Sequence, residues 1–202
     1  AGRQWVTVPG QSLAFSLVFR LSPAETEYFP CLTALGALGL IRALGELGLN
    51  ACLKWPNDVL LMGSKVGGVL VEANWQSGTV EAAVIGIGVN IAAGSVPPAQ
   101  GLRYPATDIA SALGAPVDRW VLLAQILGAM QAYRQRLTEV VFIEVWNKHL
   151  AWRGEWIRFQ LPDEQPQLMR ISEVMPDGQL ALETRDGQKF HALSGEIIVG
   201  ND

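Results

Sequence analysis

The feature that most constrains the fold is a series of short apolar segments joined by tight turns between residues 52 and 90. Gly63-Ser64 and Gln76-Ser77-Gly78 are turn sequences, and turns this short connect neighbouring antiparallel strands. The pattern therefore predicts a hairpin meander in the middle of the chain. Its expected strands are Cys52–Trp55, Val59–Met62, Lys65–Trp75 and Thr79–Asn90.

The segments on either side of the meander predict a further strand and several helices. Leu13 to Leu21 is apolar and lies between turn residues, which is typical of a buried strand. From Pro30 to Leu49 apolar residues recur every three positions, which indicates a core-facing helix, and its glycines are expected to allow close packing on a sheet. These glycines are Gly36, Gly39 and Gly45. Further helices are expected up to Leu113 with Thr107 or Asp108 as cap, from Asp118 onward, and over Phe142–Leu150.

Beyond Gly154 the pattern changes to short alternating runs separated by turn residues. Strands this short in a segment of about 50 residues are typical of a small barrel. We therefore expect two domains, residues 1–152 and residues 153–202. The expected strands of the second are Glu155–Leu161, Leu168–Met175, Gln179–Thr184, Lys189–Ala192 and Glu196–Val199.

Composition excludes several classes of protein. Fifteen Lys and Arg against 19 Asp and Glu give a net charge of −4, which argues against nucleic-acid binding through a basic face. Half of the residues are hydrophobic, which argues against disorder. No signal peptide and no membrane-spanning segment are expected, and the two cysteines, Cys31 and Cys52, are too few for a disulfide framework. These observations predict a cytoplasmic protein without a membrane partner.

Lysines, glycines and a carboxylate gather at the ends and turns of the predicted meander. Lys65 beside Gly67-Gly68 offers a cation next to accessible backbone N–H groups, which suits a carboxylate or a phosphate. The alternatives are a β-bulge at the glycines and a solvated lysine. Asp58 after Asn57 is compatible with an Asx turn or with a Mg²⁺ ligand. Gly86-Ile87-Gly88 lacks the third glycine of a dinucleotide fingerprint.

Taken together, these pieces resemble the bacterial biotin protein ligases. The resemblance covers nearly the whole chain in order and spacing. It rests on Gly2-Arg3-Gln4-Trp5, Lys54-Trp55-Pro56-Asn57-Asp58, Lys65-Val66-Gly67-Gly68-Val69-Leu70-Val71-Glu72, Gly86-Ile87-Gly88-Val89-Asn90 and Ser194-Gly195-Glu196. It implies an α+β fold, with a mixed, mostly antiparallel sheet flanked by helices, like that of class II synthetases, and a C-terminal SH3-like barrel.

The resemblance also implies the reaction and the partners. The carboxylate of biotin attacks the α-phosphorus of ATP, pyrophosphate leaves, and a lysine of a biotin carboxyl carrier protein of acetyl-CoA carboxylase then attacks biotinyl-5′-AMP. The implied small molecules are biotin, ATP and Mg²⁺. A homodimer is expected from the resemblance, and also because the apolar strand Val80 to Ile91 would need a cover if it lay at a sheet edge.

The resemblance assigns roles to individual residues. Lys65, Asp58 and Arg3 are the implied catalytic residues, with Asp58 as an implied Mg²⁺ ligand or as support for the attacking lysine. Asn90, Gly88 and Lys65 are implied on the nucleotide side. The implied biotin pocket consists of Trp5, Ser16, Lys65, Gly68, Leu70 and Gly86.

The sequence departs from the family in its first residues. Of the family's Gly-Arg-Gly-x-Arg-Gly-Arg-x-Trp loop, only Gly2-Arg3-Gln4-Trp5 is represented, so we expect the N-terminal part of the site to be missing. Two other functions remain open. One is a related lipoate or octanoate ligase or transferase, and the other is a non-catalytic carrier-binding module of the same fold.

Overall fold

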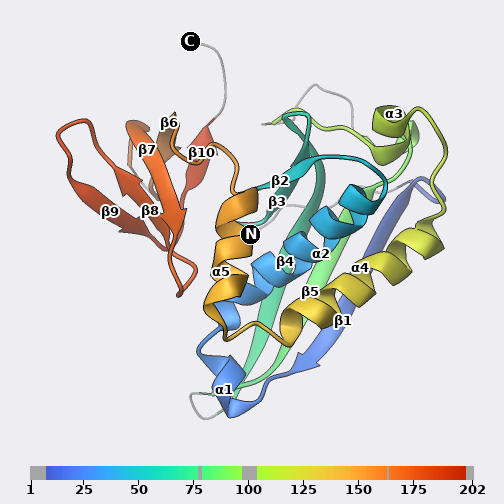
Figure 1. Cartoon of the computed structure of the whole chain (residues 1–202), viewed down its shortest axis with the longest axis horizontal. Helices are drawn as coiled ribbons and strands as arrows, with labels where there is room; N and C mark the ends of the chain where they lie inside the picture. The colour runs from blue at the N-terminus through green and yellow to red at the C-terminus, as the bar shows by residue number, and fades with distance from the viewer. Residues whose placement is uncertain (1–7, 77–78, 97–103, 163, 199–202) are drawn as a thin grey trace.

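The computed structural model of the chain describes residues 8–76, 79–96, 104–162 and 164–198. Within them the fold is α+β, with two antiparallel five-stranded sheets and a group of helices packed on the first sheet (Figure 1). The predictions for Arg3 and Trp5 lie outside the described residues.

The first sheet has the strand order β1-β5-β4-β3-β2, and all its ladders are antiparallel. Its last four strands form the predicted hairpin meander. The expected mixed sheet is wrong in detail, because parallel pairing among the described residues is limited to isolated bridges such as Leu53 with Leu150. The strands are β1 (Ser12–Arg20), β2 (Ala51–Lys54), β3 (Asp58–Leu61), β4 (Ser64–Gln76) and β5 (Thr79–Asn90).

Strand β5 lies inside the sheet, between β1 and β4. The concern that its apolar residues would form an exposed edge is therefore wrong. Both sides of β5 are paired with a neighbouring strand. Gly86 of β5, for example, lies opposite Ser16 of β1 on one side and opposite Leu70 of β4 on the other. The position of β1 follows from long-range pairing, since the residues it pairs with are more than 60 positions away along the chain.

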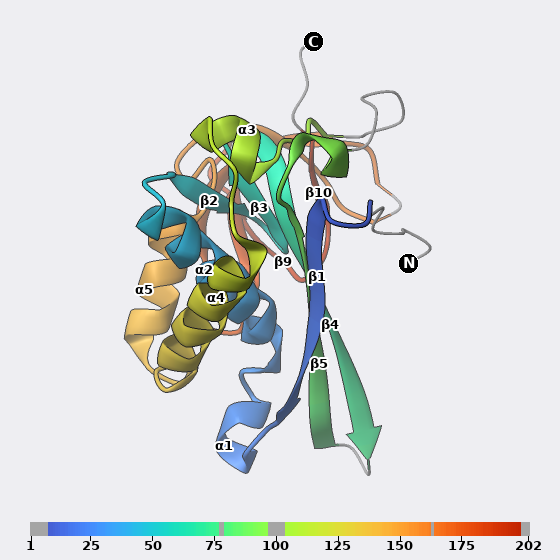
Figure 2. The ribbon, with the colours of Figure 1, turned by 90° about the vertical axis from the view of Figure 1, so that its right-hand side faces the viewer.

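The helices lie on one face of this sheet, as the view in Figure 2 shows. Helix α2 (Leu32–Glu46) packs directly on the strands, where a Cβ on Gly36 would lie 3.0 Å from Val69. A Cβ on Gly39 would lie 2.5 Å from Met130 of α4 (Arg119–Arg134), so this glycine allows the two helices to approach closely. The expectation is wrong for Gly45, which has open space around it.

Among the described residues, the segment that contains α2 is the one whose length and hydropathy would suit a membrane-spanning helix. Phe29–Glu46 is long and apolar enough to cross a membrane by length and composition alone, and 67% of it is buried inside the structure. It begins with a 3-10 turn, η1 (Phe29–Cys31), so the regular helix starts two residues later than Pro30. In this fold its apolar side chains belong to the core.

The remaining helices begin near the predicted caps. Asp108 accepts a hydrogen bond from the Ser111 N–H at the start of α3 (Ile109–Leu113), and Asp118 accepts one from the Trp120 N–H at the start of α4. Helix α5 (Val140–His149) replaces the predicted Phe142–Leu150. The short helix α1 (Pro23–Thr26), capped by Ser22, and the 3-10 turn η2 (Ala93–Ser95) were not predicted.

The second sheet has the order β10-β6-β7-β8-β9. Among the described residues no ladder joins β9 to β10, so the sheet is open where the sequence predicted a barrel. Its inner side chains, including Phe159 and Ile171, continue the hydrophobic core. The strands are β6 (Trp156–Gln160), β7 (Gln167–Val174), β8 (Leu180–Glu183), β9 (Lys189–Ala192) and β10 (Glu196–Ile198), close to the predicted ones.

Candidate functional site

The sheet face opposite the helices carries a strip of small residues. Directly paired residues of antiparallel strands point to the same side, so the register places Ser16, Gly86 and Leu70 in one row. The next row contains Ala14, Gly88 and Gly68, followed by Asp58 on β3. A Cβ on Gly86 would lie 3.7 Å from both the Ser16 Oγ and the Leu70 carbonyl oxygen. The two glycines of β5 therefore form the floor of a trough between β1 and β4.

The alternation of isoleucine and glycine along β5 produces this trough. Ile85 and Ile87 are buried on the side of α2, so Gly86 and Gly88 occupy the opposite side of the strand. Gly86 is partly exposed, so a ligand can reach the backbone of a central strand there, whereas Gly88 is buried. Leu70, which is 62% exposed, offers apolar surface beside the floor.

A β-bulge brings Lys65 to the same face. Val59 pairs with Gly67, but Leu60 pairs with Lys65, so Val66 is an extra residue in β4. The extra residue reverses the alternation, and Lys65 shares the face of Gly68 instead of that of Val69. The Lys65 Nζ forms an ion pair with the Asp58 Oδ1. Both groups border Gly68, where an added Cβ would lie 3.2 Å from the Lys65 Nζ and 3.3 Å from the Asp58 Oδ1.

Asp58 is held by the hairpin between β2 and β3. Lys54 and Asp58 form the last pair of that ladder, and the three residues between them form the connection. The Asn57 side-chain amide donates to the Val69 carbonyl oxygen at 2.9 Å, and the Val69 N–H donates to the Asn57 carbonyl oxygen at 2.9 Å. Asn57 therefore fixes the hairpin to β4 directly beside the ion pair.

The segment that follows residue 103 closes one end of the trough. The Lys65 N–H donates to the Pro105 carbonyl oxygen at 2.7 Å, and the Thr107 N–H donates to the Lys65 carbonyl oxygen at 2.9 Å. Asn90, which is buried, donates from its side chain to the Thr107 carbonyl oxygen at 2.9 Å. The predicted site residues Lys65 and Asn90 are thus linked through this segment.

The structure brings most of the predicted site residues to one face. Those in the trough or beside it are Ser16, Asp58, Lys65, Gly68, Leu70, Gly86, Gly88 and Asn90. The bulge, which the sequence left as an alternative to a site, is part of the site because it orients Lys65.

Sequence reasoning did not assign Tyr104 or Thr107 to the site, and it named Thr107 only as a possible helix cap, a role that Asp108 takes. The Lys54 Nζ lies 4.5 Å from the centre of the Tyr104 ring. Burial raises the pKa of the Tyr104 hydroxyl, with smaller contributions from the charges of Cys52 and Asp58. No local pattern identifies these residues, since they reach Lys54 and Lys65 from about 40 to 50 positions away.

The donor set of the described site does not form a metal cage. No group of three or more His, Cys, Asp or Glu side chains gathers in residues 8–76, 79–96, 104–162 and 164–198. Asp58 is already paired with an ammonium group. The arrangement can offer an apolar trough with an accessible backbone, and a cation for an anion at one end of it.

The chain is similar in sequence and fold to known proteins. Residues 1–90 match the model of the Biotin/lipoate A/B protein ligase family. A biotin--[acetyl-CoA-carboxylase] ligase of Paracoccus denitrificans is 35% identical over 74% of this chain and 63% of that protein. The bifunctional ligase/repressor BirA of Bacillus subtilis is 30% identical over 98% of this chain and 61% of its own length. The chain thus spans less than two thirds of these relatives.

A solved structure extends the similarity to the whole described fold. The biotin protein ligase of Aquifex aeolicus, in complex with biotin and ATP, matches with a TM-score of 0.77 and 28% identity, over 97% of this chain and 81% of that one. The biotin protein ligase of Leishmania major in complex with biotinyl-5-AMP matches with a TM-score of 0.61 and 22% identity, which shows a shared fold.

Proposed function

Because residues 1–90 match the model of the Biotin/lipoate A/B protein ligase family, we propose that the chain is the catalytic part of a biotin protein ligase. It would form biotinyl-5′-AMP and pyrophosphate from biotin and ATP, and then transfer biotin to a lysine of a carrier protein. The observation that carries this proposal is the trough floored by Gly86 and Gly88, with the Lys65–Asp58 pair at its end. The relatives named as biotin ligases support it.

The trough suits the two ends of biotin differently. We assign its apolar valeryl chain to the row of Ser16, Gly86 and Leu70, because this row combines exposed apolar surface with a side-chain-free strand. The carboxylate would then lie toward Gly68 and Lys65. Trp5 and Arg3 remain proposed for the same pocket on the resemblance alone.

Lys65 is proposed to bring two anions together. The biotin carboxylate and the α-phosphate repel each other, and negative charge develops on the phosphate as the oxygen attacks. An ammonium group held by Asp58 in the folded enzyme needs little reorganisation to offset that charge. Asp58 would orient the lysine before the substrates bind, and it can accept a hydrogen bond from the incoming carrier lysine.

We propose that the nucleotide lies beyond Lys65, near Gly88 and the Asn90 side chain. Asn90 holds the Thr107 backbone, so its contribution would be to shape this side of the pocket. ATP would supply Mg²⁺ as part of its phosphate complex, because the ion-paired Asp58 provides at most one carboxylate.

Three organisational proposals accompany the activity. We propose that residues 1–152 and 153–202 are separate domains, which their two separate sheets support, and that the second is an SH3-like barrel, on the resemblance alone. We propose a homodimer through β1, an edge strand on which Val18 is 73% exposed. We also propose cytoplasmic localisation, where carrier proteins and ATP are available.

The activity is tested by incubating the chain with biotin, ATP labelled at the α-phosphate, and Mg²⁺. The expected product is labelled biotinyl-AMP, followed by biotin on an added carrier domain. Formation of neither product by the whole protein from which this chain comes would reject the function. The chain alone and the whole protein are assayed side by side, so that an incomplete pocket is distinguished from a wrong assignment.

The matched family also includes lipoate ligases, so lipoate and octanoate are run as competing substrates. A biotin ligase should form at least about tenfold more acyl-adenylate from biotin, since a pocket that hydrogen-bonds a substrate group rejects analogues that lack it. A preference for lipoate or octanoate would favour that alternative. Carrier binding without any adenylate would favour the non-catalytic module.

A further inference from the structure

Trp55 connects the hairpin of the site to the second sheet. Its indole Nε1 donates a hydrogen bond to the Gly178 carbonyl oxygen at 3.0 Å, in the turn before β8. Its ring centre lies 6.1 Å from that of Phe159 on β6, and the side chain is only 2% exposed. This tryptophan is therefore buried against the second sheet, although its neighbours in the chain belong to the trough.

The contact continues through the second sheet to the Ser194-Gly195-Glu196 motif. A Cβ on Gly195 would lie 2.3 Å from the Phe159 ring, so a glycine is required where this ring packs. The ring in turn packs on Trp55. Two motifs separated by about 140 residues in the sequence thus meet through one phenylalanine.

A second connection reaches the hairpin from Lys54. The Tyr104 ring lies beside the Lys54 Nζ, and its centre is 6.4 Å from that of Trp152, which precedes β6. The Ala151 N–H also donates to the Leu53 carbonyl oxygen at 2.9 Å. The end of β2 is therefore held by the connection to the second sheet as well as by the sheet itself.

Movement of Trp55 would reach Asp58 through a short path. The two residues belong to one hairpin, whose connection Asn57 fixes to β4 by two hydrogen bonds. Asp58 in turn contacts Lys65. The hairpin is thus attached on one side to the trough and on the other to the second sheet.

We propose that Trp55 is a positioning residue: its hydrogen bond to Gly178 makes the second sheet set the location of Asp58, and through it that of the Lys65 ammonium group. The inference rests on the proposed ligase function for its kinetic consequence. Trp55 itself touches no substrate in this scheme. The second sheet then contributes to adenylation without supplying a reacting group.

The first test compares Trp55→Phe with Trp146→Phe. Both replacements keep an aromatic ring in a buried place, but the Trp146 Nε1 has no hydrogen-bond partner, so only Trp55→Phe removes a bond. We expect Trp55→Phe to lower kcat for adenylation by about 10-fold to 100-fold, because a small displacement of a catalytic group has an effect of this size. The KM for biotin should stay within about twofold of the wild-type value. Trp146→Phe should change neither value by more than about twofold.

The second test alters the acceptor with Gly178→Ala and Gly187→Ala. Both glycines have positive φ, +82° and +83°, so alanine strains each turn similarly. At Gly178 the new Cβ would also meet the Pro30 Cβ at 3.2 Å, whereas Gly187 has open space. Of these two variants, we expect only Gly178→Ala to lower kcat as Trp55→Phe does. If Trp55→Phe does not fold, Gly178→Ala tests the positioning role of Trp55 in its place.

A readout that needs no activity is the exchange of the Val69 amide, which donates to the Asn57 carbonyl oxygen. In Trp55→Phe and Gly178→Ala it should exchange about tenfold faster, while the Ala110 amide, bonded to Ile91, keeps its protection. Unchanged Val69 exchange and kcat in both variants, or equal losses in Trp146→Phe and Gly187→Ala, would overturn the inference. If the whole wild-type protein formed no biotinyl-AMP, the ligase function would be rejected. The exchange of the Val69 amide would still test whether Trp55 positions the hairpin.

Discussion

The two sheets use their outward faces in opposite ways. On the first sheet the outward positions of β5 include Gly86 and Gly88, and the backbone at Gly86 is partly exposed. On the second sheet the register places Trp156 beside Arg170, then Glu183 and Lys189, so large polar and aromatic side chains cover the strands. The difference separates a surface that can receive a ligand from one that is solvated.

The glycines also have different tasks in the two regions. An added Cβ on Gly86 would lie no closer than 3.7 Å to its neighbours, whereas one on Gly195 would lie 2.3 Å from a phenylalanine ring. In the first sheet the absence of a side chain makes room for a ligand, and in the second it makes room for the protein's own core. The same residue type therefore supports binding in one region and packing in the other.

The largest expected effect comes from removing the cation of the trough. Lys65→Ala should lower adenylation by two to three orders of magnitude, because it removes a donor to a charged transition state. Lys189→Ala is the matched control on the second sheet, and it should leave the rate within about twofold. Single-turnover formation of biotinyl-AMP measures both. Comparable rates for Lys65→Ala and the wild-type protein would show that the two sheet faces do not differ in the way described.

A smaller effect is expected from filling the floor. Gly86→Val would place methyl groups in the trough, where a Cβ at this position is 3.7 Å from its nearest neighbours, so the fold should accept it. We expect biotin affinity to fall by about 10-fold to 100-fold from the lost space, at the scale of an overpacked contact. Calorimetric titration of the whole protein measures this change. As a control, Gly128→Ala on α4, which has open space, should leave affinity unaltered.

Acid should weaken the first region through Glu25. Its carboxylate accepts hydrogen bonds from the Arg134 Nε at 2.8 Å and from the Ser22 N–H at 2.9 Å. The hydrogen bond with Arg134 is the main reason that the pKa of Glu25 falls to about 2 from its ordinary value of 4.5. Because the folded-state pKa is the lower one, the stabilisation is present above pH 4.5 and is lost as pH falls toward 2.

Glu25→Gln should therefore reduce the free energy of unfolding by about 1–2 kcal/mol at pH 7, and by almost nothing near pH 2. Urea unfolding followed by fluorescence at several pH values measures the difference. The substitution lies far from the trough in the fold, so adenylation at pH 7 should persist. A difference from wild type that grows as pH falls would contradict the assignment.

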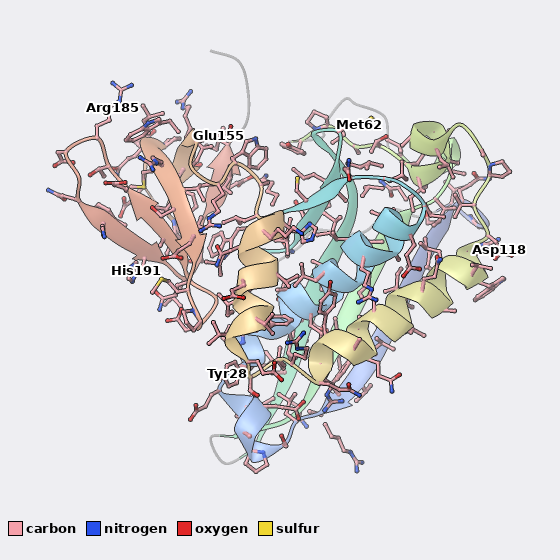
Figure 3. All side chains as sticks on the ribbon, in the orientation of Figure 1. Tyr28, Met62, Asp118, Glu155, Arg185 and His191 are labelled. Atoms are coloured by element: carbon pink, nitrogen blue, oxygen red, sulfur yellow. The ribbon has the colours of Figure 1, made fainter. Side chains whose placement is uncertain are left out.

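The smallest effect is expected on the outer face of the second sheet. Arg185 lies 5.9 Å from the Trp156 ring, and it extends into solvent beyond β8 (Figure 3). Arg185→Gln should change stability by less than about 0.5 kcal/mol and adenylation by less than about twofold. A large loss of carrier biotinylation, with adenylation intact, would show that this face has a binding task of its own.

The sequence by itself determined the local elements of this protein. Turn residues specified the hairpins from β2 to β5, apolar periodicity specified α2, and Asp108 and Asp118 marked helix starts. The alternation of Ile85, Gly86, Ile87 and Gly88 already separated a core face from a face without side chains. These signals are readable because they depend on residues close together in the chain.

Only the tertiary structure decided how these elements form a site. It placed β1 beside β5, which sets Ser16 against Gly86, and it located the bulge that turns Lys65 toward Asp58. It also joined Trp55 to Gly178. Each of these depends on which of several compatible registers or neighbours packs best in the whole molecule, and nearby sequence does not contain that information because the competing arrangements share the same local pattern.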